Sequence, residues 1–553
     1  MKRFVLILWL AALFLPAIQA NNIAVANVSV TDQSALLNHC NVKFDLSWDN
    51  SWRTTAVPGN WDAAWVFVKY RISGGVWKHA SLDTATDSHT PASGSVITPG
   101  KDFKGVFIYR AVEGSGTNTW TNIKLRWKYG LDEVPDDATL EVRVFAIEMV
   151  YIPQEAYYLG DGNGSSESLR AWHRYGFDNT SVLIGTVTDT VQVDSGSPSD
   201  DDYAKALSGA YLTVNGPGGI LTTGGAVNQT NPDFPTGYKA FYLMKYETSV
   251  EQYMDFLNCL TRAQQVNRVE TDISIGTTSV TNVYVMSNNT MCEARNGIRC
   301  STTIPASDPV VFFCDADQDG IGNENNDGQN IVGVFFSWLD HAAYSDWAGL
   351  RPMTEPEYEK ACRGPNPAVL GEYAWGNTNI HTSAYTLTNY GAPDEGISNP
   401  GVNTGNANHN FLMSYGPVRC GVFAAVSSNH TRQETGATYY GVMEMSGNSP
   451  EYCIMLGSPA GRSFTGKHGD GELTNDGYGN VDYWPGINGN NSAMTPNTVY
   501  GGTTGITSYA GLFYRGGSSS SSAAALGVSY RYQVSDYTFR EYFKGFRSAH
   551  TAP

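Results

Sequence analysis

The sequence has little charge and few long hydrophobic stretches. Asp, Glu, Lys and Arg make up only 16% of its 553 residues, and the formal net charge is −18. No run of basic residues occurs, so the electrostatic signature of a nucleic-acid-binding protein is missing. Beyond the first twenty residues, no apolar run approaches the roughly 20 residues that a membrane-spanning helix needs. We therefore expect neither a nucleic-acid partner nor a membrane span.

Cysteine is also sparse. Eight cysteines in a chain of this length do not define a disulfide-dependent scaffold, and their spacing fits no zinc site. An even number still permits disulfides, and Cys292 and Cys300 are close enough in sequence to close a small loop. The last cysteine is Cys453, so residues 454–553 contain no thiol.

The first twenty residues predict export. Lys2 and Arg3 precede an apolar run over residues 4–18, and Ala20 offers a small residue at a cleavage site. This order is typical of a secretory signal peptide. A membrane anchor is the alternative, which the short length of the apolar run disfavours. We expect residues 1–20 to be cleaved and the mature protein to be secreted, either to the extracellular space or to the cell surface.

Residues 21–146 predict β-structure. Runs of β-branched and aromatic residues, such as VFVKYRI at 66–72 and LEVRVFAIEMVYI at 140–152, alternate with turns rich in Gly, Asn, Asp and Pro. Several short strands at this spacing predict a β-sandwich. The segment contains no cluster of His, Cys or carboxylates, so we expect an adhesion, spacer or assembly module.

The rest of the chain predicts a few short helices within a β- and loop-rich α+β fold. Three capping boxes, in which a Ser or Thr precedes an acidic or amide residue by three positions, each indicate a helix start. They are Ser249 with Gln252, Ser337 with Asp340, and Thr354 with Glu357. No helix is expected beyond residue 365, where the chain is rich in Gly, Asn, Tyr and Trp. Ligands or metal ions often stabilise irregular chain of this kind.

Several segments, in order, resemble one known family. They are MVYIPQEAYYLGDG (149–162), FYLMKYETSVEQYMDFL (241–257), VGVFFSWLDHAAYSDWAGLRPMTEPEYEKACRG (332–364) with EYAWGN (372–377), GVMEMSGNSPEY (441–452), RGGS (515–518) and GFRSA (545–549). This set resembles the formylglycine-generating-enzyme or sulfatase-modifying-factor family, whose fold is related to C-type lectins. The resemblance predicts such a domain over residues 147–553, with insertions around 161–236 and 263–330.

The resemblance also implies a reaction for which this sequence lacks the residues. The family's enzymes oxidise a sulfatase cysteine to formylglycine, using two cysteines that bind copper shortly after RGGS. Here the stretch reads RGGSSSSSAAALGVSYRYQVSDY, and no cysteine follows Arg515. Serine is a poor substitute because its hydroxyl has a much higher pKa than a thiol and binds soft metals weakly. We expect a pseudoenzyme without copper. A serine hydrolase is a weaker alternative, since no GxSxG motif is present.

Relatives without the cysteines indicate recognition or assembly instead. Some bacterial members of the family are structural, and the variable proteins of diversity-generating retroelements bind ligands between an RGGS-like start and a GFR-like end. Residues 519–544 occupy that position here, and their Ser, Tyr and Arg content suits adaptable recognition. The candidate contacts are Tyr530, Arg531, Tyr532, Asp536, Tyr537 and Arg540. Tyr530 and Tyr532 equally fit core positions on one strand face.

The clearest local chemistry is DADQDGIGN at 315–323, which matches the order of donors in a calcium loop. Its donors are Asp315, Asp317, Asp319, the carbonyl of Ile321, and Asn323. Asn326 stands where a bidentate Glu is expected, and Asp327 follows it. This departure argues against a pair of EF-hand helices but leaves the oxygen donors in place. A solvated acidic insertion is the alternative.

The resemblance implies further calcium positions. In GVMEMSGNSPEY the family's ligands map onto the side chains of Glu444 and Glu451 and the carbonyls of Gly447 and Ser449. Another family site begins at Asn389 and Tyr390, where no acidic partner is evident. Both glutamates are hard oxygen donors, which suit calcium. Ca²⁺ is therefore the expected cofactor.

Together these patterns predict an exported, calcium-stabilised binding or surface-assembly protein whose partner is a protein or a carbohydrate at the cell surface. Two alternatives stay open. One is a structural subunit that self-assembles into an extracellular filament or surface complex. The other is an enzyme, of the formylglycine-generating or another kind, with a non-standard site.

Overall fold

The computed structural model describes most of the chain. The described residues are 22–161, 182–184, 190–192, 211–215, 219–223, 230–231, 233–429, 431–454, 461, 463–487, 511–530 and 539–553. The expected signal peptide lies outside them. Strands far outnumber helices, so the fold is α+β and dominated by β-structure, as the sequence predicts. Within the described ranges, no helix has the length and apolar character needed to cross a membrane.

The strands are β1 (Ala24–Ser34), β2 (His39–Arg53), β3 (Asp62–Ile72), β4 (Lys78–His79), β5 (Ser95–Pro99), β6 (Val106–Arg110), β7 (Gly114–Trp127), β8 (Leu140–Ile152), β9 (Tyr157–Leu159), β10 (Val182–Ile184), β11 (Thr190–Gln192), β12 (Tyr211–Asn215), β13 (Gly219–Thr223), β14 (Thr230–Asn231), β15 (Phe241–Met244), β16 (Ile298–Cys300), β17 (Phe312–Cys314), β18 (Arg351–Pro352), β19 (Leu387–Thr388), β20 (Gly396–Ile397), β21 (Glu451–Ile454), β22 (Leu512–Arg515) and β23 (Ser548–Thr551). The helices are α1 (Val250–Leu257), α2 (Arg262–Val266), α3 (Trp338–Trp347), α4 (Glu355–Arg363) and α5 (Arg432–Thr435).

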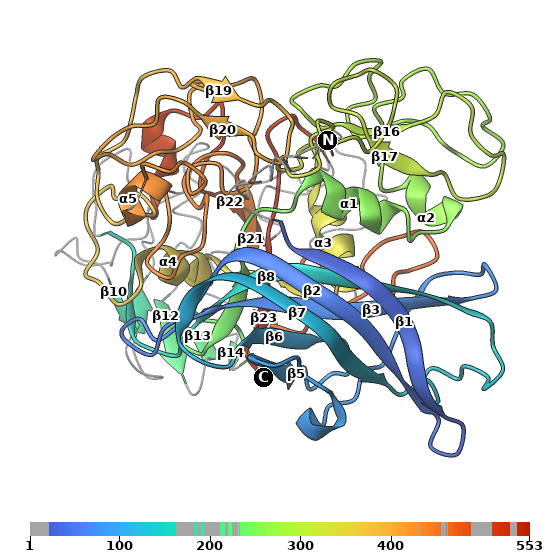
Figure 1. The fold of residues 1–553 in the computed structure, drawn as a ribbon. Coiled ribbons are helices and arrows are strands. Elements are labelled where there is room, and N and C mark those ends of the chain that lie inside the picture. Colours follow the sequence, from blue (N-terminus) through green and yellow to red (C-terminus); the bar gives the residue numbers. More distant parts are fainter. Residues whose placement is uncertain are drawn as a thin grey trace, which may run out of the picture.

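One eight-stranded sheet contains strands from both ends of the chain. Its main path runs β18-β23-β15-β8-β3-β6-β5, and β4 pairs with β3. Strand β8 pairs with β3 from Leu140 to Val150, but with β15 only at its C-terminal end, from Met149 to Ile152. The predicted boundary between residues 146 and 147 falls inside β8. That strand therefore leads directly from the N-terminal sheet into the part of the chain that carries the helices (Figure 1).

Strand β3, in the middle of the eight-stranded sheet, is buried on both faces. Along β3, Val66 and Val68 belong to an apolar cluster with Phe44 of β2, in the three-stranded sheet β1-β2-β7. The alternate residues Trp65 and Phe67 belong to a second cluster, which includes residues of α1 and α3. A strand buried on both faces reads as a continuous apolar run instead of an alternating one. The sequence AAWVFV at 63–68 follows this rule.

The predicted capping boxes begin the longer helices. Ser249, Ser337 and Thr354 are the N-cap residues of α1, α3 and α4, and each box is complete. The short helices α2 and α5 also begin with complete boxes, at Thr261 and Thr431. The expectation of no helix beyond residue 365 was therefore wrong for the single turn of α5. The same local signal, Thr followed three residues later by Gln or Glu, identifies both missed helices.

Candidate metal centre

The acidic loop after β17 is held closed at its neck. Strand β17 pairs with β16, and Asp315 follows it directly, donating its backbone N–H to the Gly297 carbonyl (2.9 Å). Across the loop, Asn323 Oδ1 accepts the Cys314 N–H and the Asn323 N–H donates to the Cys314 carbonyl, both at 2.9 Å. Gly320 turns the chain with a φ of 89°. These bonds hold the carboxylates between residues 315 and 327 near one another.

Two groups of carboxylates gather in this loop. Within each group, one oxygen of each side chain lies within 4.8 Å of the others. The first group is Asp315, Asp317 and Asp327, and the second is Asp317, Asp319 and Glu324. Asp315 and Asp327 are buried, and the remaining three are exposed. All the donors are hard oxygens, which favours calcium or magnesium over soft metals.

The negative charge of the loop is poorly balanced. Arg299 forms an ion pair with Asp315, the only ion pair to these five carboxylates among the described residues. Asp327 Oδ2 accepts the Glu324 N–H (2.6 Å), whereas its Oδ1 is buried without a hydrogen-bond partner in the described chain. Burial, reinforced by Asp317 and Asp315, raises the pKa of Asp327 to about 6. A bound cation would relieve this cost, because an oppositely charged neighbour favours the ionised carboxylate.

The carboxylates that cluster in the loop overlap in part with the predicted donors. Asp317 belongs to both groups, Asp315 to the first and Asp319 to the second. Asn323, however, uses its side-chain oxygen to close the neck of the loop, and Ile321 is 59% exposed, with its N–H bonded to Asp319. Asp327 and Glu324 join the carboxylate groups instead. Asp327 stands one position beyond the last ligand of an EF-hand loop, so it falls outside that spacing.

The glutamates of the segment 441–452 lie around a buried arginine. Glu451 Oε1 accepts two bonds from the Arg547 guanidinium (2.9 and 2.7 Å), and Glu444 Oε1 accepts the Gly421 N–H (2.9 Å). The other carboxylate oxygen of each glutamate is buried without a hydrogen-bond partner among the described residues. Burial raises the pKa of both side chains to about 7.

The amide groups at the two predicted backbone positions of this segment are hydrogen-bonded. Gly447 has a φ of 95°, and its N–H donates to the Gly516 carbonyl (2.8 Å). The Ser449 N–H donates to the buried Glu247 (2.8 Å), and the Ser449 hydroxyl donates to the Phe543 carbonyl (2.8 Å). Two free carboxylate oxygens fit the hard-donor set of a calcium ion, so the residues present are compatible with the predicted site.

Asn389 and Tyr390 lie beside a buried arginine–glutamate ion pair, in which the arginine neutralises the glutamate. Asn389 donates to Asp394 (2.8 Å), and the Arg295 guanidinium lies over the Tyr390 ring, 4.2 Å from its centroid. Arg295 is paired with the buried Glu395. Two acidic side chains that the sequence did not identify thus lie near these residues, Asp394 and Glu395, and Arg295 supplies the counter-charge of Glu395.

The predicted recognition stretch is only partly described. Arg531, Tyr532, Asp536 and Tyr537 lie outside the described residues. Tyr530 is half-buried and lines a small pocket of about 50 Å³ with Pro450 and Phe543. Arg540 is almost fully buried, and its guanidinium donates two bonds to Asp340, both at 2.8 Å. Arg540 therefore ties the stretch to α3.

The serines after RGGS are ordered. The Ser518 hydroxyl bonds the hydroxyls of Ser520 and Ser521, each at 2.9 Å, and the Ser519 carbonyl accepts the Phe411 N–H (2.7 Å). Farther along the chain, Ser529 donates to the buried Glu359 (3.2 Å). These contacts give the serines structural roles.

The cysteines form no disulfide bond, and the one nearest to the RGGS segment is buried. All eight cysteines are free, so Cys292 and Cys300 do not close a disulfide loop. Cys453 of β21 lies opposite Phe513 of β22, close in sequence to RGGS, and is fully buried. Burial raises the pKa of every one of the eight thiols. Thiolate formation is therefore disfavoured at each position.

Comparison with known families gives one match. The model of the sulfatase-modifying factor enzyme 1-like domain matches residues 206–552, which is more than half of the chain. The match includes the acidic loop, the glutamate segment and the stretch from RGGS to GFRSA. A search of curated proteins finds no significant match.

The raised pKa of Asp327 predicts that the thermal stability of the protein depends on pH when divalent cations are absent. The pKa of Asp327 is higher in the folded protein than in the unfolded chain, so protonation of this carboxylate stabilises the fold. This stabilisation is complete below about pH 4 and is lost as the pH rises through about 6. In a chelator, Asp327→Asn should therefore unfold at a higher temperature than the wild type at pH 7, and the difference should shrink toward pH 4. Thermal unfolding monitored by circular dichroism measures it. Asp319→Asn, at an exposed carboxylate, is the matched control. Equal behaviour of the two variants would contradict the account of Asp327.

Proposed function

This chain belongs to the sulfatase-modifying factor enzyme family, and from that premise we propose that it is a calcium-stabilised binding or surface-assembly protein without the family's oxidase chemistry. The observation that carries the proposal is the absence of cysteine after Arg515, where the resemblance places the copper-binding pair. The eight thiols that do occur are elsewhere, and their raised pKa values oppose the thiolate state that copper ligation requires. The scaffold can persist without that pair, because packing and ion pairs hold it.

Export is part of the same proposal. The positively charged and apolar first twenty residues support a cleaved signal peptide and a secreted or cell-surface protein. The finer fold that we propose is an N-terminal β-sandwich followed by a C-type-lectin-related domain. The apolar cluster shared by β2, β3, β6 and β7 supports the sandwich. Such a protein meets millimolar calcium outside the cell, where weak extracellular sites are occupied.

Calcium would act as a structural tie. In the acidic loop, Asp315 directly follows β17 and Asp327 lies near the other end of the loop, so an ion bound to both would link the two ends of an irregular segment. In the glutamate segment, Glu444 and Glu451 would hold the ion through their two unpaired oxygens. At both positions the ion's chemistry is to offset buried negative charge, with no part in a reaction.

The recognition surface that we propose is the stretch from residue 519 to residue 544, held at both ends. At the start, Arg515 pairs with the buried Glu359 (2.5 Å), and at the end Arg540 pairs with Asp340 (2.8 Å). A binding segment gains precision when rigid elements support it. Arg540 then positions the segment instead of contacting the ligand. The Tyr and Ser content between these anchors suits a protein or carbohydrate partner.

A second candidate function is a structural subunit of an extracellular filament or surface complex. Strand β1 lies at the edge of its three-stranded sheet, and its Val28 and Val30 are 37% and 41% exposed. Exposed edge strands with apolar side chains can pair with another copy of the chain.

Calcium should reverse the effect of Asp327→Asn. The Asp327 carboxylate destabilises the protein in a chelator but would coordinate the ion when calcium is present. The wild type should therefore gain more thermal stability from millimolar CaCl₂ than the variant. Calorimetric titration of the chelated protein should show heat of binding in the wild type and a weaker affinity, by about 10-fold or more, in the variant. Asp476→Asn, at an exposed acid outside the loop, should titrate like the wild type. Identical melting temperatures with and without calcium would refute the role of the ion.

The missing cysteine pair predicts the absence of one reaction. When the mature protein is incubated with copper, oxygen and a peptide carrying the sulfatase-type cysteine motif, mass spectrometry should show no conversion of cysteine to formylglycine. Removal of the Cys453 thiol by Cys453→Ala should make no difference. Formation of the aldehyde product would overturn the proposal, and its loss in the variant would identify Cys453 as the thiol responsible.

Electron microscopy separates the two candidate functions. A binding protein should remain as single particles with and without a chelator. Ordered polymers that disappear when Val28→Lys and Val30→Lys are introduced on β1 would support the structural subunit. The matched change Val76→Lys, at a valine that is 54% exposed outside β1, should leave any polymer intact.

A further inference from the structure

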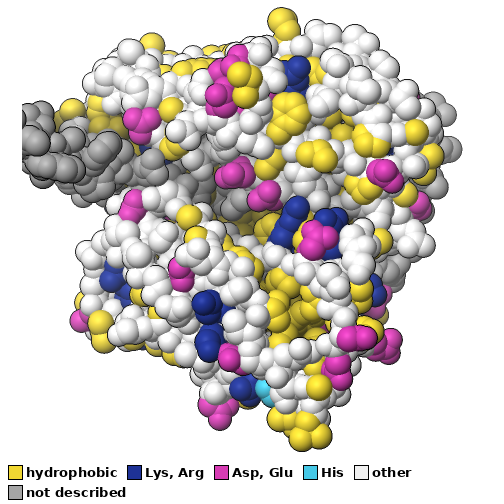
Figure 2. All heavy atoms as spheres, turned by 45° about the vertical axis from the view of Figure 1, so that its right-hand side comes forward, with side chains coloured by type: hydrophobic (Ala, Val, Ile, Leu, Met, Phe, Trp, Pro, Cys, Tyr) yellow, Lys and Arg dark blue, Asp and Glu magenta, His cyan; other side chains and the backbone are white. Residues whose placement is uncertain are grey.

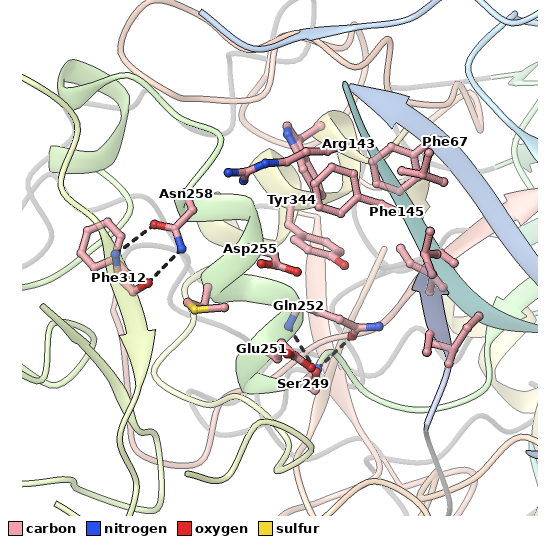
Figure 3. A pocket seen from close by; sticks show the side chains of 18 of the residues that line it. Phe67, Arg143, Phe145, Ser249, Glu251, Gln252, Asp255, Asn258, Phe312 and Tyr344 are labelled. Carbon is pink, nitrogen blue, oxygen red and sulfur yellow. Dashed lines mark hydrogen bonds between the residues drawn. The ribbon is translucent and has the colours of Figure 1, made fainter. Parts of the chain in front are cut away.

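A cleft of about 980 Å³ separates β8 from α1. Residues 142–147 of β8 line one side of it, and Glu251 and Asp255 of α1, with its C-cap residue Asn258, line the other. The start of β1 and residues 309–312 complete the wall. On the face turned forward in Figure 2, hydrophobic side chains lie open at the bottom of a hollow, with basic and acidic side chains around it. In Figure 3, Asp255 projects from α1 toward the aromatic side chains of the sheet.

The edge of β8 inside this cleft has no strand partner. Strand β15 pairs with β8 only as far as Met149, and the Lys245 N–H then donates to the Glu148 carbonyl (2.9 Å). Beyond Lys245 the chain leaves the sheet and enters α1. In an antiparallel ladder, alternate residues direct their backbone groups to the same side. Val142, Val144 and Ala146 therefore present their N–H and C=O groups to the cleft, as Glu148 does to β15. No described residue hydrogen-bonds to them.

The free edge is recessed, which limits what can occupy it. Helix α1, residues 309–312 and the start of β1 all line the cleft around this edge. A whole sheet from a second molecule would meet these walls, whereas one extended strand could enter between them. Side chains of such a strand would find apolar surfaces, since Phe145, Tyr344 and Val311 line the cleft. Val311 is 72% exposed at the rim.

Among the described residues, two carboxylates without an ion pair face the cleft, against one such cation, Arg143. Glu251 and Asp255 lie one turn apart on α1, and neither carboxylate has a hydrogen bond or an ion pair with a described residue. Burial and the neighbouring Glu251 raise the pKa of Asp255 to about 7, opposed by Arg143. The Arg143 guanidinium is already engaged, because it lies over the Trp77 ring at 4.6 Å and donates to Cys259 Sγ (3.7 Å). A basic group in the cleft would therefore meet two unsatisfied carboxylates.

We propose that this cleft binds an extended peptide of another protein, which adds a strand to the free edge of β8 and places a Lys or Arg side chain against Glu251 and Asp255. The peptide strand occupies the position beside β8 that β15 would fill if it were longer. Its backbone therefore hydrogen-bonds the N–H and C=O groups of Val142, Val144 and Ala146 that face the cleft. Strand addition of this kind draws affinity from the main chain and specificity from alternate side chains. Six residues of β8 line the cleft, so the bound segment spans about 20 Å at a strand's rise. The proposal depends neither on calcium nor on residues 519–544.

A displayed library of random ten-residue peptides tests the proposal. Panned on the mature protein, it should yield peptides that alternate apolar and polar residues and carry at least one Lys or Arg. A synthetic peptide from the enriched set should bind at least 10-fold more weakly to the double variant Glu251→Gln, Asp255→Asn. The matched control, Glu472→Gln with Asp476→Asn, changes two exposed acids outside the cleft and should change affinity less than 2-fold. If the enriched peptides matched segments of this chain, the cleft would bind a second copy of the protein. That result would overturn the proposal that the peptide comes from another protein.

A second arm uses the wild-type protein only, so it remains decisive if the double variant fails to fold. N-methylation of alternate backbone nitrogens in the selected peptide blocks one edge of the added strand, and methylation of the intervening nitrogens blocks the other. One of the two series should lose binding by at least 10-fold while the other binds within 3-fold of the parent. No enrichment from the library, equal binding by both methylated series, or undiminished binding to the folded double variant would each overturn the proposal.

Discussion

The architecture depends on the pairing of β3, which is buried on both faces, with β8. Eleven consecutive pairs, from Asp62 with Val150 to Ile72 with Leu140, join these strands. The face with Val66 and Val68 packs on the β1-β2-β7 sheet, and the face with Trp65 and Phe67 packs on helices of the family domain. The indole of Trp65 also donates to the Ala348 carbonyl (2.8 Å). The N-terminal region is thereby an integral layer of the fold.

Buried ion pairs hold the loop-rich remainder. Arg515, Arg540 and Arg547 each pair with a buried carboxylate on a distant segment. Isolated buried charges are costly, and such pairs stabilise only when their hydrogen bonds are satisfied. Arg540 meets that condition by donating to both carboxylate oxygens of Asp340, whereas Arg547 donates twice to one oxygen of Glu451 and leaves the other without a partner among the described residues. The carboxylates that lack such partners, Asp327 foremost, are the positions where a cation would complete the balance.

The acidic loop and the cleft share part of their structure. Phe312 and Asn323 line the cleft, and the same Asn323 closes the neck of the acidic loop through Cys314. An ion in the loop would stiffen one wall of the cleft without touching a bound peptide. Peptide binding and calcium binding would then be coupled, because the ion would make one wall of the cleft more rigid. Such coupling matches the proposed role of an extracellular binding or assembly protein more closely than that of a redox enzyme.

The sequence by itself determined what short-range chemistry controls. A capping box involves residues three positions apart, so Ser249, Ser337 and Thr354 marked three helices, and the same pattern at Thr261 and Thr431 could have marked the other two. The acidic loop and the missing cysteine pair were equally visible, and the ordered motifs predicted the family. Tertiary structure alone decided the rest. Asp327 joins Asp315 and Asp317 in one carboxylate group, Arg540 becomes an anchor for α3, and β8 keeps a free edge because β15 ends early. These outcomes depend on which distant segments pack together, and no local pattern encodes the partner of a buried charge or a strand edge.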